Sequence, residues 1–208
     1  TGSLLQYLNP QATQTQADEV YAALASVMPD GLSITDQAEA ADQDSYVVTT
    51  ALADQYGLQE IGDLSRLPGV TLGGNSELET RPYGPKGLES MYGVKVGFTP
   101  IEDSGGALTV KALENNQVQL VDIYSSDPVL AKGKLKILND PKGLILASRV
   151  VPVVSSRLDS NAREVLNRVS KQLGPQDLVE MNRQSTVEAQ SASAIASKWL
   201  ESKGLPHK

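Results

Sequence analysis

The sequence predicts an α/β protein built as two lobes, with mostly parallel sheets and helices on both of their faces. Between residues 15 and 154, short apolar or β-branched segments alternate with segments of helical periodicity, a pattern typical of such sheets. From residue 159 to residue 203 the pattern is helical only. A chain that leaves one lobe, builds a second and returns as C-terminal helices indicates a hinged, two-lobed layout.

The expected strands are short and rich in β-branched or aliphatic residues. Residues 46–50 (YVVTT) give a clear example, and in 134–138 the apolar residues Leu135 and Ile137 alternate with lysines, as on a strand with one buried face. In chain order, the expected strands are 32–34, 46–50, 70–72, 94–96, 118–123, 134–138, 144–146 and 150–154.

The expected helices are marked by their start and stop signals. Residues 15–18 resemble a capping box ahead of an apolar series at helical spacing. Gly57 can take the left-handed conformation that ends a helix, and Asp159 or Ser160 can cap the first helix of the C-terminal block. The expected helices are 18–28, 51–56, 61–67, 88–92, 107–113, 160–173, 175–182 and 191–203.

Composition excludes several classes of function. The 208 residues carry a net charge of −7, and a surface of that sign repels nucleic acid. Cysteine is absent, which removes disulfides, thiolate metal sites and thiol nucleophiles. The single histidine, His207, stands next to the last residue, where we expect a frayed tail. No cofactor and no metal site are therefore predicted.

The stretch 98–128 holds the most informative candidate site. It reads as a helix opened by glycines, an Asn-Asn turn, an apolar strand and then residues 124–127 (YSSD). An aromatic and three small polar side chains thus follow the carboxyl end of a strand, where open α/β sheets bind small ligands. No nucleophile motif accompanies them, so the sequence indicates a protein that holds a ligand and is not an enzyme.

Three further segments could bind an anion. Residues 73–76 (GGNS) could cradle one with backbone N–H groups or form a plain turn. Arg81 could grip a carboxylate with two hydrogen bonds or stay solvated in its loop. Residues 104–106 (SGG) open a helix, whose amino end favours anions, although ordinary capping explains them equally well.

Two tyrosines could bind a cation. Tyr46 and Tyr124 lie at predicted strand edges, where their rings could hold a quaternary ammonium or simply pack against the protein. Several carboxylates could in principle pair for acid–base chemistry, but their spacing shows no pair, so we expect them to be solvated. These carboxylates are Asp44, Glu77, Glu79, Asp103 and Asp127.

A set of motifs in a fixed order resembles one protein family. In chain order the motifs are YGL at 56–58, IGDL at 61–64, GG at 73–74, TRP at 80–82, GL at 87–88, YG at 92–93, KAL at 111–113, YSSD at 124–127 and VPVV at 151–154. Together they resemble the substrate-binding proteins of osmoprotectant (glycine betaine, carnitine, choline) ABC transporters, which have the type II periplasmic binding protein fold.

The resemblance implies the lobes and the ligand contacts. It places lobe 1 at 1–48 plus 154–208 and lobe 2 at 49–153, with the ligand in the cleft between them. Residues 1–4 (TGSL) resemble the tail of a family motif, so we expect lobe 1 to lack its first part. The family's ligand contacts match Ser3, Asp44, Tyr46, Arg81 and Tyr124, with Tyr46 and Tyr124 as walls of a cation cage, and Ser148 stands where many members have another cage tyrosine.

The implied function is that of an extracytoplasmic solute-binding component of an ABC importer. The expected partners are a small quaternary-ammonium or related polar solute and a membrane permease, with no nucleic acid. The protein is expected in the periplasm or on the cell surface as a lipoprotein, and an incomplete lobe 1 could form oligomers through exposed sheet edges. The alternatives are a ligand-sensing domain of a regulator with the same fold and a binder of a non-cationic solute.

Overall fold

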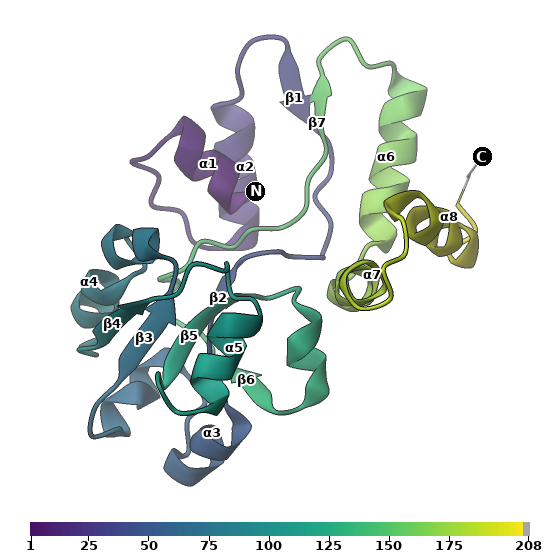
Figure 1. Cartoon of the computed structure of the whole chain (residues 1–208). Coiled ribbons are helices and arrows are strands. Elements are labelled where there is room, and N and C mark those ends of the chain that lie inside the picture. Colours follow the sequence, from purple (N-terminus) through teal and green to yellow (C-terminus); the bar gives the residue numbers. More distant parts are fainter. Residues whose placement is uncertain (206–208) are drawn as a thin grey trace. The chain divides into compact units, whose positions relative to one another are not determined.

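The computed structural model describes residues 1–205 and confirms the α/β fold class (Figure 1). The chain forms two compact units. Unit 1 comprises Thr1–Gln43, Ser126–Pro128 and the described residues from Leu146 on, and unit 2 comprises Asp44–Ser125 and Val129–Ile145. His207, which we expect in a terminal tail, lies outside the described residues.

The borders of the units differ from the expected lobes at three places, one of which is the segment Ser126–Pro128, expected in lobe 2 but part of unit 1. Residues 44–48 belong to unit 2, because the strand that contains them pairs with two other strands of that unit. Residues 146–153 belong to unit 1, where Val150 exchanges backbone hydrogen bonds of 2.9 Å with Ala38 and Ala40. Backbone pairing therefore sets the borders at residues 44–48 and 146–153.

Unit 2 alternates strands with short helices. Its elements are β2 (Asp44–Thr49), α3 (Thr50–Tyr56), the 3-10 helix η1 (Ile61–Arg66), β3 (Thr71–Gly74), the 3-10 helix η2 (Ser76–Thr80), α4 (Pro85–Gly87), the π-helix η3 (Leu88–Tyr92), β4 (Gly97–Pro100), α5 (Ala107–Glu114), β5 (Leu120–Tyr124), the 3-10 helix η4 (Pro128–Lys132), which begins at the unit border, and β6 (Leu135–Ile137).

The sheet of unit 2 has five strands in the order β4-β3-β5-β2-β6. β3 is parallel to β4 and β5, whereas β2 is antiparallel to β5 and β6. Four strands therefore point the same way and β2 runs against them. The expectation of a mostly parallel sheet holds for this unit, with β2 as the exception.

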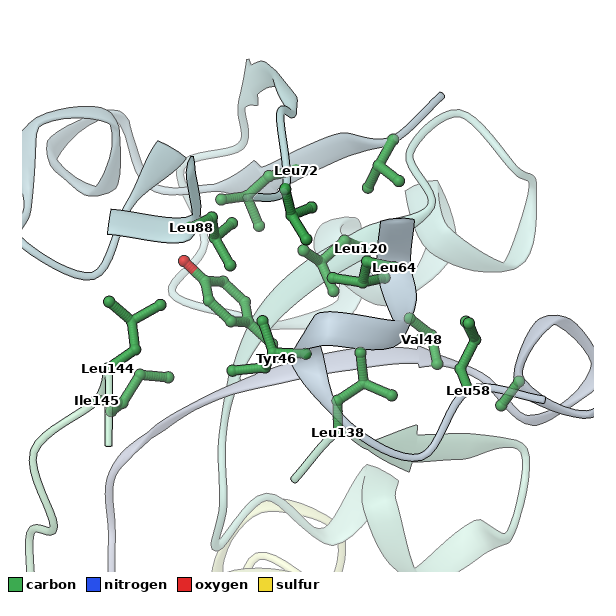
Figure 2. Close-up of a cluster of buried hydrophobic side chains, with 14 of the residues drawn as sticks. Tyr46, Val48, Leu58, Leu64, Leu72, Leu88, Leu120, Leu138, Leu144 and Ile145 are labelled. Carbon is green, nitrogen blue, oxygen red and sulfur yellow. The ribbon is translucent and has the colours of Figure 1, made fainter. Parts of the chain in front are cut away.

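Side chains alternate between the two faces of this sheet and fill a core on each. From β2, Tyr46 and Val48 enter one cluster, shown in Figure 2, together with Leu72 and Leu120. The opposite face carries Val47, Val121 and Ile123, which pack with α5. Each large aliphatic side chain buried in this way contributes about 1.5–3 kcal/mol of transfer free energy.

The helix expected at 51–56 and its stop at Gly57 are confirmed, and the structure adds a cap at Thr49. The hydroxyl of Thr49 accepts a hydrogen bond of 3.1 Å from the backbone N–H of Leu52, which caps the start of α3. Gly57 ends that helix in the left-handed region, with φ of 64°. The sequence therefore delimits α3 at both ends.

Unit 1 is mainly helical. Its elements are α1 (Gly2–Leu8), α2 (Ala17–Ser26), β1 (Leu32–Ile34), β7 (Val153–Ser155), α6 (Ser160–Gln172), α7 (Pro175–Thr186) and α8 (Ala192–Ser202). β1 and β7 pair antiparallel as a two-stranded sheet. Leu5, Val20, Leu24 and Ile34 form the buried cluster of this unit. The carboxylate of Asp159 caps α6 as expected, accepting a bond of 2.9 Å from the N–H of Ala162.

Three expected elements differ from the structure. The predicted capping box at 15–18 is wrong, because the carbonyl of Thr15 accepts from Ala147 and α2 begins after Gln16, which makes no side-chain cap. The strand expected at 94–96 lies instead at β4. The strand expected at 144–146 is absent, since the N–H of Ile145 bonds to the carboxylate of Asp140 at 2.8 Å instead of to a strand.

Within residues 1–205, none of the helices has the length and apolar character that crossing a membrane requires.

Candidate functional site

The candidate site of unit 2 begins where β2 starts and β5 ends. In this antiparallel pair, Asp44 stands opposite Tyr124 and Tyr46 stands opposite Asp122. Opposite residues share a face of the sheet, and so do residues two apart on one strand. The register therefore gathers two carboxyls and two phenols on one face, the face from which Tyr46 enters the core shown in Figure 2.

Asp122 is the most perturbed group of this face. Burial raises its pKa to about 8, and the neighbouring Asp44 adds to the effect through its charge and a hydrogen bond between the two carboxyls. A backbone hydrogen bond from Ser45 offsets part of the shift. One oxygen of Asp122, Oδ1, is buried without a hydrogen-bond donor. Burial therefore favours the protonated form of Asp122.

Tyr83, from the loop after η2, completes the contacts of Asp44. Burial raises the pKa of the Tyr83 phenol, and the charge of Asp44 and its hydrogen bond to the phenol raise it further. Asp44 thus interacts with a phenol and with a second carboxyl. We call these residues, together with Arg81, the Asp–Tyr cluster: Asp44, Arg81, Tyr83 and Asp122.

Tyr46 is a core residue, and its burial does not fit the expected role as a cage wall. Only 1% of its surface is exposed, and Figure 2 shows its ring inside the buried cluster near Leu88. Its hydroxyl donates to the backbone carbonyl of Tyr83, and burial raises its pKa far above the usual value. A ring packed in this way has no face to offer a cation.

Arg81 lies at the exposed side of the cluster. Its side chain is 45% exposed, and Nη2 is 3.2 Å from Oε1 of Glu77, whose side chain is 65% exposed. An ion pair between exposed groups contributes only about 0–1 kcal/mol, so a ligand carboxylate can replace Glu77 at little cost. The charge of Arg81 also acts on Tyr83, whose pKa it lowers.

The expected group at 124–127 is divided between the two units. Tyr124 ends β5 in unit 2 and is 44% exposed. Ser126 belongs to unit 1, where its hydroxyl donates to the carboxylate of Asp42 at 2.6 Å and accepts from Nδ2 of Asn182 at 2.9 Å. Tyr124 therefore presents an aromatic surface, whereas Ser126 holds α7 to the rest of its own unit.

In unit 1 the structure brings the segments of Ser3 and Ser148 together. Ser3 is exposed near the start of α1, next to Gly2, and a Cβ on Gly2 would lie 2.7 Å from the carbonyl oxygen of Ala147. The N–H of Ser148 donates to Oε1 of Gln43 at 3.0 Å. The close approach at Gly2 places two of the expected ligand contacts on adjacent segments.

The two expected anion cradles do not fit the structure. Gly73 and Gly74 are part of β3, and a Cβ on Gly74 would lie 2.7 Å from the side chain of Leu78, so these glycines serve close packing. The amino end of α5, which residues 104–106 precede, already has an anion. The carboxylate of Asp103, expected to be solvated, accepts the N–H groups of Leu108 at 2.6 Å and Thr109 at 3.3 Å.

Sequence reasoning missed Asp122 and Tyr83. The signal for Asp122 was available, because a carboxylate inside the apolar strand 120–123 (LVDI) must be neutralised or paired when the strand is buried. Tyr83 lies in a loop and carries no comparable signal. Its contact with Asp44 depends on how η2 and α4 fold back on the sheet.

Comparison with known proteins agrees with this architecture. A family described as the substrate binding domain of the ABC-type glycine betaine transport system matches residues 5–202. A glycine-betaine-binding protein of Pseudomonas aeruginosa is 25% identical over 161 residues, which cover 71% of this chain and 52% of that protein. The ergothioneine transport permease/ergothioneine binding protein EgtU of Helicobacter pylori is 21% identical over 165 residues, which cover 77% of this chain and 30% of that protein.

Solved structures show the same fold. A structure described as a glycine betaine/carnitine/choline ABC transporter superposes with a TM-score of 0.84 at 20% identity, over 98% of this chain and 76% of the other. Lactococcal OpuAC, in its closed form with glycine betaine, gives a TM-score of 0.62 at 16% identity, over 98% of this chain and 82% of the other. These neighbours confirm the type II periplasmic binding protein fold.

The chain spans about half the length of the Pseudomonas relative and about a third of the Helicobacter one. The family match, in contrast, covers nearly every residue that the structure describes. On that match, this chain belongs to the family of substrate-binding domains of ABC-type glycine betaine transport systems.

Proposed function

We propose that this chain captures a small quaternary-ammonium or related polar solute and delivers it to the permease of an ABC importer. The observation that carries the proposal is the Asp–Tyr cluster. It combines a carboxylate, Asp44, with a half-exposed guanidinium, Arg81, in one unit of a chain that belongs to this family. A zwitterion such as glycine betaine has the complementary pair of charges.

The charges and the aromatic surface suggest how such a solute would bind. The ammonium end would lie near Asp44 and the ring of Tyr124, which stand opposite each other in the sheet. The carboxylate end would take the place of Glu77 on Arg81. The ligand contacts expected at Ser3 and Ser148 of unit 1, and closure of the two lobes on the solute, stay predictions of the resemblance.

The energetics require the charged groups. One aromatic ring contributes about 0.5–2 kcal/mol to holding a cation. Binding in the micromolar range needs about −8 kcal/mol. Because Tyr46 is part of the core, Tyr124 is the aromatic contact that remains from the expected cage. Asp44 and Arg81 must therefore supply most of the affinity.

The proposed setting follows from the family. The solute-binding domains of ABC importers work outside the cytoplasm, so we place this chain in the periplasm or, as a lipoprotein, on the cell surface. Two lines support the class of solute, because one relative is named for glycine betaine and another for ergothioneine, which also contains a quaternary amine. Pairing of copies through the short sheet β1-β7 is a further proposal.

Calorimetric titration of the full-length protein tests the proposal. The solutes are glycine betaine, carnitine, choline, ergothioneine and a non-cationic polyol. We expect micromolar binding of at least one quaternary amine. Arg81→Ala should weaken glycine betaine about 10- to 100-fold and leave choline, which has no carboxylate, within about twofold. Binding of the polyol alone, or of none of the five, would contradict the proposal.

The matched control is Arg66→Ala. Arg66 also forms an ion pair with an acidic neighbour in unit 2, with Nη2 2.7 Å from Oδ1 of Asp63, but it lies on η1 and outside the Asp–Tyr cluster. Its loss should leave the affinity for glycine betaine unchanged. Equal losses in both variants would indicate a general effect of removing positive charge and not a contact at Arg81.

A further inference from the structure

Asp122 has no place among the expected ligand contacts, yet it adjoins Asp44, which has one. The two residues come from neighbouring strands, β5 and β2, and are offset by one pair in the register. Their carboxyls are hydrogen-bond neighbours, although ionised carboxylates are acceptors only. A hydrogen bond between two carboxyls requires that one of them carries a proton.

The surroundings assign that proton to Asp122. Its oxygen Oδ1 is buried and receives no hydrogen bond from a donor, which is very unfavourable for an ionised carboxylate and far less so for a neutral one. Both residues are partly buried, and Asp44 also has the phenol of Tyr83 beside it. The buried oxygen without a donor is therefore the observation that assigns the proton to Asp122.

We propose that Asp122 is a positioning residue for Asp44, whose protonated carboxyl fixes the ligand-facing carboxylate and makes the capture of cationic solutes depend on pH. The inference rests on the proposed function, since it takes Asp44 as the contact for the ammonium group. With one proton the pair has one negative charge, and without it two. A cation binds the doubly charged pair more strongly, and its binding expels the proton.

The other groups that face the pair do not titrate in the same range. Burial raises the pKa of Tyr46 and of Tyr83 far above neutrality, and Arg81 stays protonated. The remaining charged neighbours act on residues around the pair and not on the pair itself. The charge of Asp140 acts on Tyr46, and that of Glu77 acts on Arg81. The pKa of Asp122, at about 8, therefore sets where the change occurs.

The test is the affinity of the full-length protein for choline between pH 6.5 and pH 9.5. Choline has a permanent charge and no carboxylate, so a change with pH reports on the protein. We expect the affinity of the unmodified protein to rise about 3- to 10-fold across this range. The amide of Asp122→Asn can still donate to Asp44. The affinity of this variant for choline should equal that of the unmodified protein at pH 6.5 and should not change with pH.

Two more variants separate positioning from simple structure. Asp122→Ala removes the donor, so its affinity for choline at pH 7 should fall about tenfold and be restored by Asn at the same position. Asp54→Asn neutralises an exposed aspartate on α3 of the same unit and should keep the pH dependence of the unmodified protein. Carbon-detected NMR of the ligand-free protein should show Asp122 titrating near pH 8 and not near pH 4.

The outcomes distinguish this inference from the proposed function. If choline binds with the same affinity at every pH, or if NMR shows that Asp122 titrates near pH 4, the positioning role is wrong while the proposed function stands. If no quaternary amine binds at any pH, the proposed function fails and the positioning role fails with it.

Discussion

The hydroxyl of Tyr46 donates a hydrogen bond to the backbone carbonyl of Tyr83, and this bond ties the buried face of β2 to the loop that carries Arg81. Tyr46 pairs with Asp122 across the sheet, and Tyr83 contacts Asp44 through its own hydroxyl. The core and the candidate site of unit 2 therefore share residues. Changes in this part of the core should alter binding as well as stability.

Tyr46→Phe should lower the free energy of unfolding of unit 2 by about 1–3 kcal/mol, because it leaves the carbonyl of Tyr83 without its donor. The loop at Arg81 should loosen, so that glycine betaine binds more weakly while the fold is kept. Urea denaturation and calorimetry measure the two effects. Tyr7→Phe is the matched control, since Tyr7 is 81% exposed in unit 1, and equal stability in both variants would contradict the prediction.

Asp122 should make the stability of the protein decrease with rising pH. Its pKa is raised from 3.8 to about 8, so between these values the folded state holds a proton that the unfolded state has lost. The stabilisation is therefore complete below pH 4 and is lost as the pH rises to 8, with a slope of at most about 1.4 kcal/mol per pH unit.

Asp122→Asn isolates this contribution. Other groups shift in the opposite direction, such as Asp63, whose pKa is lowered mainly by a backbone hydrogen bond from Gln59, and they act equally in both proteins. The difference in the free energy of unfolding, Asn variant minus unmodified protein, should therefore increase from pH 5 to pH 8. A constant difference in urea denaturation over this range would show that Asp122 is ionised when folded.

Gly84→Ala should disturb the loop that presents Arg81. A Cβ at Gly84 would lie 2.0 Å from the carbonyl oxygen of Leu78 and 3.2 Å from that of Arg81, so the backbone must move. We expect the free energy of unfolding to fall by about 1–3 kcal/mol. The affinity for glycine betaine, which has a carboxylate for Arg81, should fall more than the affinity for choline. Gly69→Ala, where a Cβ would meet nothing within 4 Å, should change neither.

Much of the fold could be predicted from local sequence signals. The helix α3 has its cap at Thr49 and its stop at Gly57, and the strands β2 and β5 are rich in β-branched and aliphatic residues. The strand expected at 144–146, which is absent from the structure, shows the limit of such signals. Leu144 and Ile145 are apolar enough for a strand, but Asp140 binds the backbone of Ile145 and both side chains enter the core.

The candidate site could be predicted only in part, because it depends on register. Asp44, Arg81 and Tyr124 could be matched to the family residue by residue, whereas the contact between Asp44 and Asp122 requires the pairing of β2 with β5. β2 runs against its neighbours, and a prediction of parallel strands does not place these two carboxyls together. Tyr46, which the sequence placed at a strand edge, lies on the core face of β2 and is buried there.

Tyr124 provides the last prediction, because it is the exposed aromatic residue of the expected set. Tyr124→Ala should weaken choline and glycine betaine about 2- to 30-fold, the range that corresponds to about 0.5–2 kcal/mol for one cation–π contact. Tyr124→Phe keeps the ring and should bind within about twofold of the unmodified protein.

The side chain of Tyr124 is 44% exposed, so Tyr124→Ala should leave the free energy of unfolding within about 0.5 kcal/mol of the unmodified protein. Met91→Ala is a suitable control, since Met91 is a comparably exposed apolar residue of unit 2 that lies on η3 and outside the Asp–Tyr cluster. If Tyr124→Phe loses as much affinity as Tyr124→Ala, the hydroxyl makes the contact. The solute would then be held near Asp44 by hydrogen bonding and not by the face of the ring.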